Sequence, residues 1–232
     1  MKICGLQKTT LLDFPGRVAA TVFLGGCNFR CPFCHNTDLL GGDAPELMSV
    51  DQLLTFLKRR SGILEGVCIT GGEPTLHGEE LIFLIRSIKA LGYQVKLDTN
   101  GAHPQLLRQL KEDGLLDYVA MDIKSGRFQY PRICGTPGLT MAPVEESIRL
   151  LMEGHTPYEF RTTVVNGLHS AEDFRDIAQW IKGCSRYFLQ GFVDSGNVLE
   201  SGFSAFSRKE LEEFLDIVKP FIPTAEIRGV DY

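Results

Sequence analysis

The chain has 232 residues, of which 44% are hydrophobic and 23% are charged, and its formal net charge is −5. This length suits one large domain with a substantial core, and the negative net charge gives no overall basic footprint for nucleic-acid binding. No apolar run approaches the roughly 18 residues of a membrane helix, and the N-terminal segment lacks the apolar stretch of a secretory signal. We therefore expect a cytoplasmic protein with reduced cysteines and with neither a membrane nor a nucleic acid as partner.

Strand-like and helix-like segments alternate along the chain. Apolar, β-branched runs predict strands over 17–23, 66–70, 93–99, 117–123, 158–165 and 186–192. Amphipathic stretches predict helices near 49–60, 77–91, 103–113, 143–154, 170–182 and 207–219. A last short run, 225–229, is typical of an edge strand.

Several helix boundaries are marked in the sequence. Ser49 and Ser207 each precede a glutamine or glutamate by three residues, which is the spacing of a capping box. Gly92 and Gly114 lie where two helices should end. Six strands alternating with helices imply a parallel α/β sheet, either doubly wound or closed into a complete or partial β/α barrel. In each of these folds the chemistry lies at the carboxyl ends of the strands.

Three of the seven cysteines, Cys27, Cys31 and Cys34, lie within eight positions after the first predicted strand. Thiolates at this spacing can converge on one metal centre. A complete [4Fe–4S] cluster takes four cysteines, so three would leave one iron open to a substrate. On spacing alone, zinc held by three cysteines and either His35 or His77 is the alternative. No second cysteine cluster follows, so a reductant would have to come from another protein.

Polar or glycine-rich groups follow four successive strands. The motif TGGEP (70–74) follows the second strand, DTNG (98–101) ends the third, and MDIK (121–124) ends the fourth. Arg161 interrupts the apolar fifth run, where an arginine is costly unless it faces a ligand or an acidic group. Each motif alone could be an ordinary turn or a solvated strand end. Four in succession indicate a binding site. Cys68, inside the second run, is predicted to be a small core residue.

The spacing Cys27-x3-Cys31-x2-Cys34 with aromatic Phe33, followed by GGEP, resembles the radical S-adenosylmethionine (SAM) superfamily over roughly residues 10 to 192. The resemblance implies a partial (β/α)6 TIM-like barrel. It also implies a [4Fe–4S] cluster whose open iron binds SAM. We expect one domain over 1–232, with the core at about 15–192 and a C-terminal helix and edge strand at 193–232.

The segment 10–36, together with DTNG and MDIK, resembles the glycyl-radical-enzyme activases, and most closely the activating proteins of anaerobic ribonucleoside-triphosphate reductase. By this resemblance the three cysteines hold the cluster and Phe33 lies against the SAM adenine. The SAM amino end is contacted by Gly71, Gly72 and Glu73. The methionine carboxylate is surrounded by Asp98, Asp122 and Lys124, with Thr99 and Asn100 at the same rim, an optional monovalent cation near Thr99, and Arg161 as a further SAM contact.

The implied reaction is reductive cleavage of SAM, followed by removal of a hydrogen atom from a glycine of a partner enzyme. A flavodoxin or ferredoxin would supply the electron, and no side chain is needed as a general base. Two other enzymes stay open: a pyruvate formate-lyase-type activase, and a small-molecule enzyme similar to 7-carboxy-7-deazaguanine synthase.

One position departs from the activase pattern. Pyruvate formate-lyase activases carry a SAM-contacting histidine near the end of the sixth strand, where this chain has Phe192. Gln190 is expected to supply a polar contact in its place. His103 and His169 lie in predicted loops and are expected to be solvated.

Overall fold

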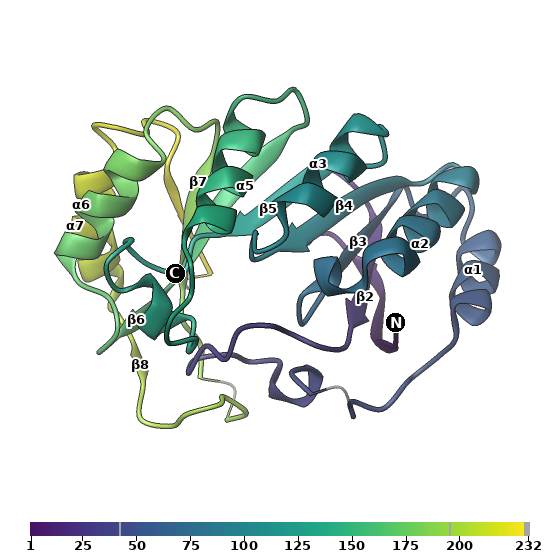
Figure 1. Cartoon of the computed structure of the whole chain (residues 1–232), viewed down its shortest axis with the longest axis horizontal. Coiled ribbons are helices and arrows are strands. Elements are labelled where there is room, and N and C mark those ends of the chain that lie inside the picture. The colour runs from purple at the N-terminus through teal and green to yellow at the C-terminus, as the bar shows by residue number, and fades with distance from the viewer. Residues whose placement is uncertain (42, 195, 230–232) are drawn as a thin grey trace. The chain divides into compact units, whose positions relative to one another are not determined.

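The protein is represented by a computed structural model that describes residues 1–41, 43–194 and 196–229 (Figure 1). The chain folds into two compact units. Unit 1 consists of Met1–Asn28, Asp38–Ala120 and Gly154–Pro157. Unit 2 consists of Phe29–Thr37, Met121–Glu153 and the residues from Tyr158 on.

Unit 1 is built on a sheet of mostly parallel strands. Its strands are β1 (Ile3–Thr10), β2 (Ala19–Leu24), β3 (Gly66–Gly71) and β4 (Gln94–Thr99). β2 pairs in parallel with β3, and β3 with β4, while β1 pairs antiparallel with the free edge of β2. Because β2, β3 and β4 are covered on both faces, nearly all their residues are buried, as the continuous apolar runs predict.

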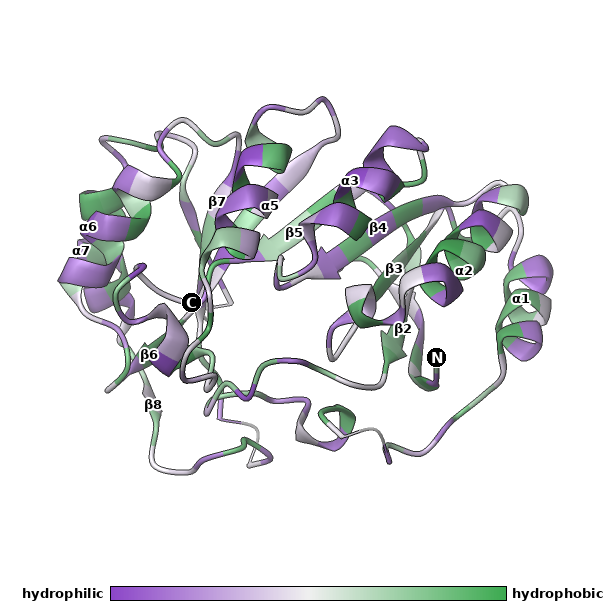
Figure 2. Cartoon of the chain, viewed as in Figure 1, coloured by the Kyte–Doolittle hydropathy of each residue, from purple (hydrophilic) through white to green (hydrophobic). Residues whose placement is uncertain are grey.

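The helices of unit 1 follow these strands. They are α1 (Val50–Arg59), η2 (Pro74–His77), α2 (Gly78–Ala90) and α3 (Pro104–Glu112). α2 packs on β4, and α1 packs on α2 (Figure 1). Figure 2 shows hydrophilic and hydrophobic residues mixed along α1 and α2, as expected for helices with one buried side.

Strand β5 (Tyr118–Asp122) begins in unit 1 and ends in unit 2. Within unit 1, the Asp117 N–H donates to the Val95 carbonyl at 2.9 Å. Within unit 2, the Ile123 N–H donates to the Arg161 carbonyl at 2.8 Å. The turn η1 (Thr37–Leu39) also crosses from one unit to the other.

Unit 2 contains the remaining elements. These are α4 (Tyr130–Ile133), α5 (Ala142–Met152), β6 (Tyr158–Asn166), α6 (Ala171–Trp180), β7 (Tyr187–Gly191), β8 (Ser204–Ala205), α7 (Arg208–Val218) and β9 (Glu226–Arg228). β6, β7 and β9 run parallel in that order, and β8 pairs antiparallel with β6. α6 and α7 lie side by side (Figure 1).

The predicted elements are confirmed to within about two residues at each end. Both predicted capping boxes form, at Ser49 and Ser207, and at the start of α6 the Asp173 carboxylate accepts from the Ser170 N–H at 2.9 Å and from its hydroxyl at 2.8 Å. Gly92 and Gly114 follow helices with φ of +87° and +65°, the left-handed conformation expected at a helix end. The edge strand predicted at 225–229 is β9, whereas the end of the chain at 230–232 lies outside the described residues.

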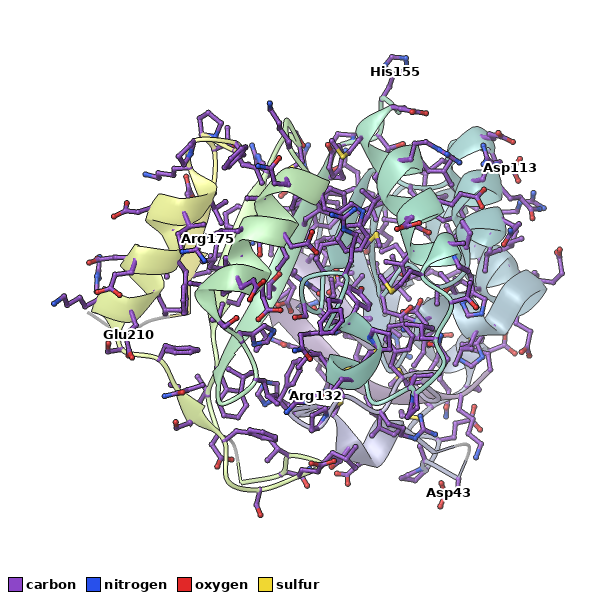
Figure 3. All side chains as sticks on the ribbon, turned by 60° about the vertical axis from the view of Figure 1, so that its left-hand side comes forward. Asp43, Asp113, Arg132, His155, Arg175 and Glu210 are labelled. Atoms are coloured by element: carbon purple, nitrogen blue, oxygen red, sulfur yellow. The ribbon has the colours of Figure 1, made fainter. Side chains whose placement is uncertain are left out.

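Two strands were not predicted, β1 and the two-residue β8. β1 has the sequence ICGLQKTT, in which Gly5 and a polar second half hide the alternation typical of a strand. Among the described residues, no helix is both long and apolar enough to cross a bilayer. Polar side chains such as Asp113, His155 and Arg175 are exposed, and Figure 3 shows His155 projecting outward.

Candidate functional site

The loop after β2 carries Cys27 and is held by main-chain bonds to the TGGEP turn after β3. The Gly72 N–H donates to the Leu24 carbonyl at 2.9 Å, and the Glu73 N–H donates to the Gly26 carbonyl at 2.7 Å. A Cβ atom added to Gly72 would lie 2.0 Å from the Gly26 carbonyl oxygen. Only glycine therefore allows the two loops to approach this closely.

The Glu73 side chain joins the TGGEP turn to the end of β4. Its Oε1 accepts bonds from the Thr75 N–H at 3.0 Å, the Thr75 hydroxyl at 2.5 Å and the Thr99 hydroxyl at 2.7 Å. Its Oε2 accepts from the Asn100 N–H at 2.6 Å. Glu73 is only 1% exposed, and burial raises the pKa of its carboxyl even though the four hydrogen bonds act to lower it. This carboxylate is therefore fully engaged in holding the turn and the strand end together.

Asn100 extends this network back to the cysteine loop. Its amide nitrogen donates to the Asn28 side-chain oxygen at 2.8 Å, and its own oxygen accepts from the Ala102 N–H at 3.0 Å. Asn28 is the residue after Cys27. Unit 1 thus brings together the cysteine loop, GGEP and DTNG, three motifs that are separated in the sequence.

Asp98 lies within β4 and is 9% exposed. Its carboxylate forms a short ion pair with Lys96, which is 1% exposed. Cys68, 3.7 Å from the Asp98 oxygen, is buried in β3 as predicted. Lys96 was not singled out from the sequence.

In unit 2, Cys31 and Phe33 are buried and Cys34 is half-buried. The Cys34 N–H donates to the Cys31 carbonyl at 3.0 Å, which closes a tight turn around Phe33. The next residue, His35, stacks on Phe192 with ring centroids 5.5 Å apart. The aromatic Phe192 therefore packs against the cysteine segment, while Gln190 is partly exposed on β7.

Asp122, Lys124 and Arg161 form the rim ion cluster of unit 2. Asp122 accepts from the Lys124 ammonium at 2.8 Å and from the Arg161 guanidinium at 2.5 Å. Burial alone would raise the pKa of Asp122, but the charges of Arg161 and Lys124 hold it well below its usual range. Burial would lower the pKa of Lys124, but the charges of Asp122 and of a Cys31 thiolate raise it well above its usual range. The cluster carries one cation more than it has anions, which suits a ligand carboxylate.

The prediction that His169 is solvated is wrong, because this residue is only 6% exposed. Its Nδ1 accepts from the Val165 N–H at 3.1 Å, so its Nε2 carries the proton and donates to the Lys124 carbonyl at 2.8 Å. Its ring also packs edge-on against Phe33, with centroids 6.3 Å apart. His103 is half-buried, with Nδ1 3.0 Å from the Thr75 hydroxyl. A single histidine in a loop carries no sequence signal of such burial.

Replacing His169 by phenylalanine is expected to lower the free energy of unfolding by about 2 kcal/mol, because two main-chain groups lose their partner. Burial lowers the pKa of His169. Wild-type stability should therefore fall as the pH falls through about 6.5, where the unfolded imidazole takes up a proton that the folded one does not. His169→Phe should lack this acid-side loss. Urea unfolding at several pH values measures both effects, with the exposed His155→Phe as control. Equal pH profiles for wild type and His169→Phe would contradict this assignment.

The described residues contain no group of three histidine, cysteine, aspartate or glutamate side chains arranged to hold a metal ion. Cys27 belongs to unit 1, whereas Cys31 and Cys34 belong to unit 2. None of the three forms a disulfide bond. Three thiols outside any disulfide provide donor chemistry that fits an iron–sulfur cluster with one open position. Lys124 lies close enough to Cys31 for the pKa of the lysine to be raised by it.

Comparison with known proteins agrees with this donor set. The model of the Radical SAM superfamily matches residues 21–181. A protein of Methanocaldococcus jannaschii, provisionally named a glycyl-radical enzyme activating enzyme, is 31% identical over 99% of this chain and 96% of its own. The 7-carboxy-7-deazaguanine synthase of Thermococcus kodakarensis is 27% identical over 75% of this chain and 74% of its own. The structure of Streptococcus suis SuiB bound to precursor peptide SuiA superimposes with a TM-score of 0.68 at 13% identity, covering 90% of this chain and 48% of that one. This likeness confirms the predicted fold class.

Proposed function

Because the chain belongs to the radical SAM superfamily, we propose that it activates a glycyl-radical enzyme, and specifically an anaerobic ribonucleoside-triphosphate reductase. The observation that carries the activase function is the similarity to the M. jannaschii relative, which extends over nearly the whole of both chains. The choice of reductase rests on the resemblance of segment 10–36 alone. A pyruvate formate-lyase-type partner is the alternative within the same function.

As a radical SAM enzyme, the protein uses a [4Fe–4S] cluster and SAM, and Cys27, Cys31 and Cys34 are the residues that would hold the cluster. When bound, these groups supply a one-electron cleavage of SAM that yields a carbon radical able to remove a hydrogen atom. The zinc alternative loses its support, because spacing was its only argument.

The chain's own residues would bind and orient SAM. In unit 1, Glu73 fixes the Gly71–Gly72 turn, so that main-chain groups of the turn are held still for the SAM amino end. In unit 2, Lys124 and Arg161 offer positive charge to the methionine carboxylate, and Asp122 keeps both side chains in place. Phe33 would contact the adenine. Thr99, Asn100 and Gln190 would add polar contacts.

We further propose that the whole chain works as one domain and receives its electron from a flavodoxin or ferredoxin. None of the seven cysteines forms a disulfide, which suits a reducing compartment such as the cytoplasm.

The test begins with protein purified without oxygen and supplied with dithionite and SAM. We expect about four irons per chain and formation of 5'-deoxyadenosine. Adding the anaerobic reductase should then produce a glycyl radical, detected by electron paramagnetic resonance. Pyruvate formate-lyase, tested in parallel, should give none. SAM cleavage without a radical on either enzyme would overturn the activase function.

A small-molecule reaction is the second candidate, favoured by the similarity to the T. kodakarensis synthase over three quarters of both chains. The measurement that distinguishes the two functions is which molecule loses a hydrogen atom. The deazapurine precursor should be unchanged after incubation with the reduced enzyme and SAM. Its conversion would replace the activase function by this one.

A further inference from the structure

Lys96 is a buried lysine inside the strand that ends in DTNG. Lys96 and Asp98 are two residues apart on β4, so their side chains leave the same face of the sheet. Lys96 Nζ forms a short ion pair with the Asp98 carboxylate and lies 3.7 Å from the Cys68 sulfur. Lys96 is 1% exposed and Asp98 9% exposed, so the pair is shielded from solvent. A lysine buried to this extent is stable only because it has a charged partner.

The activase resemblance implies an optional monovalent cation near Thr99, and this pair contains the neighbouring carboxylate, Asp98. A bound Na⁺ or K⁺ needs several oxygen atoms that are not already facing a positive charge. The Asp98 carboxylate faces an ammonium group, and the Thr99 hydroxyl donates to Glu73 at 2.7 Å. In unit 2, Asp122, the other carboxylate that the resemblance implies near the methionine end of SAM, is paired with both Lys124 and Arg161. These residues do not fit an additional cation.

We propose that the Lys96 ammonium takes the place of a monovalent cation at Asp98, so that this enzyme binds SAM equally well without Na⁺ or K⁺. Lys96 is a positioning residue in this role: it neutralises Asp98 and holds β4 at the point where Thr99 and Asn100 join the Glu73 network. The inference depends on SAM as the ligand, and it does not depend on which protein or small molecule is the substrate.

The experiment compares SAM affinity in sodium, potassium and tetramethylammonium chloride at equal ionic strength, because tetramethylammonium is too large to replace a small bound cation. Equilibrium dialysis on the cluster-loaded protein gives the dissociation constant. The thermal midpoint of the cluster-free protein in the same salts gives a second readout. For the wild type we expect both quantities to be the same in all three salts, with dissociation constants within about twofold.

Lys96→Met keeps the length of the side chain and removes its charge, so the buried Asp98 carboxylate loses the cation with which it is paired. In tetramethylammonium we expect its SAM affinity to be at least about tenfold weaker than that of the wild type. Sodium or potassium should strengthen SAM binding by the Lys96→Met variant several-fold and raise its thermal midpoint. The double variant Lys96→Met/Asp98→Asn removes both charges and should fold without responding to the salt. Lys89→Met, which breaks a partly exposed pair with Asp117, is the matched control and should not respond either.

Two results would overturn the inference. One is a wild type that loses more than about fivefold in SAM affinity in tetramethylammonium, since a separate cation would then be required. The other is a folded Lys96→Met variant whose affinity and thermal midpoint are indifferent to the salt. If Lys96→Met folds in none of the salts, the wild-type comparison and the charge-preserving Lys96→Arg, which should stay salt-independent, decide the question. Failure of the activase function would be seen separately, as SAM cleavage without a radical on the partner.

Discussion

Replacing Cys31 by alanine is expected to remove the iron–sulfur cluster and to lower 5'-deoxyadenosine formation at least about a thousandfold. Only two of the three clustered thiols would remain, and two thiolates do not hold a [4Fe–4S] cluster on one chain. The measurement is iron and sulfide per chain after anaerobic reconstitution, followed by 5'-deoxyadenosine in the presence of dithionite and SAM. The iron content should fall from about four atoms per chain in the wild type to nearly none in Cys31→Ala.

Cys134→Ala is the matched control for this change. Cys134, like Cys31, is a buried cysteine of unit 2 that forms no disulfide, and its thiol donates to the Pro131 carbonyl at 3.6 Å. Both variants should lose a similar small amount of packing, but only Cys31→Ala should lose iron. Full iron content in Cys31→Ala, or one zinc and no iron in the wild type, would contradict the assignment of the cluster ligands.

Replacing Glu73 by alanine should lower the free energy of unfolding by about 3–5 kcal/mol. The buried main-chain donors of Thr75 and Asn100 and two hydroxyl groups would all lose their common acceptor. SAM affinity should fall at least about tenfold, because the glycine turn is no longer held in place. Urea unfolding and equilibrium dialysis measure the two effects. Glu79→Ala, an exposed glutamate of the same unit, should change neither.

The Glu73→Gln variant separates charge from shape. A glutamine amide can accept bonds at one position but cannot accept the Asn100 N–H at the other, so we expect a loss of about 1–3 kcal/mol. Burial raises the pKa of Glu73 above its ordinary value near 4.5, so its stabilising contribution is full below that pH and declines as the pH rises through the folded value. The difference in free energy of unfolding between wild type and Glu73→Gln should therefore become smaller as the pH rises. A difference that widens would show that the ionised form is the favoured one.

Much of the fold could be predicted from local sequence, because its determinants lie within a few residues. The buried strands β2, β3 and β4 are continuous apolar runs, and two capping boxes mark helix starts. The antiparallel strand β1 was missed because its stability comes from pairing with β2 rather than from its own composition.

The site was predictable in its parts but not in its connections. The cost of an arginine in an apolar strand predicts that Arg161 faces a ligand or an acidic group, and in the structure it pairs with Asp122. Lys96 also had a signal, since it alternates with Val95 and Leu97 and shares a strand face with Asp98. The hydrogen-bond partners of Glu73 had no such signal in the sequence. Thr99 and Asn100 reach it only through the register of β3 beside β4, which no local pattern specifies.

The close approach of Gly72 to Gly26 limits how this enzyme can be engineered. The contact joins main chain to main chain, and a single added methyl group at Gly72 would overlap the Gly26 carbonyl. Because the contact is between main-chain atoms, no other side chain at these positions can preserve the spacing. Most variants in a mutant library at these two glycines would therefore have a displaced cysteine loop. Exposed positions such as Phe128 can be randomised without this restriction, whereas Gly26 and Gly72 should be kept unchanged.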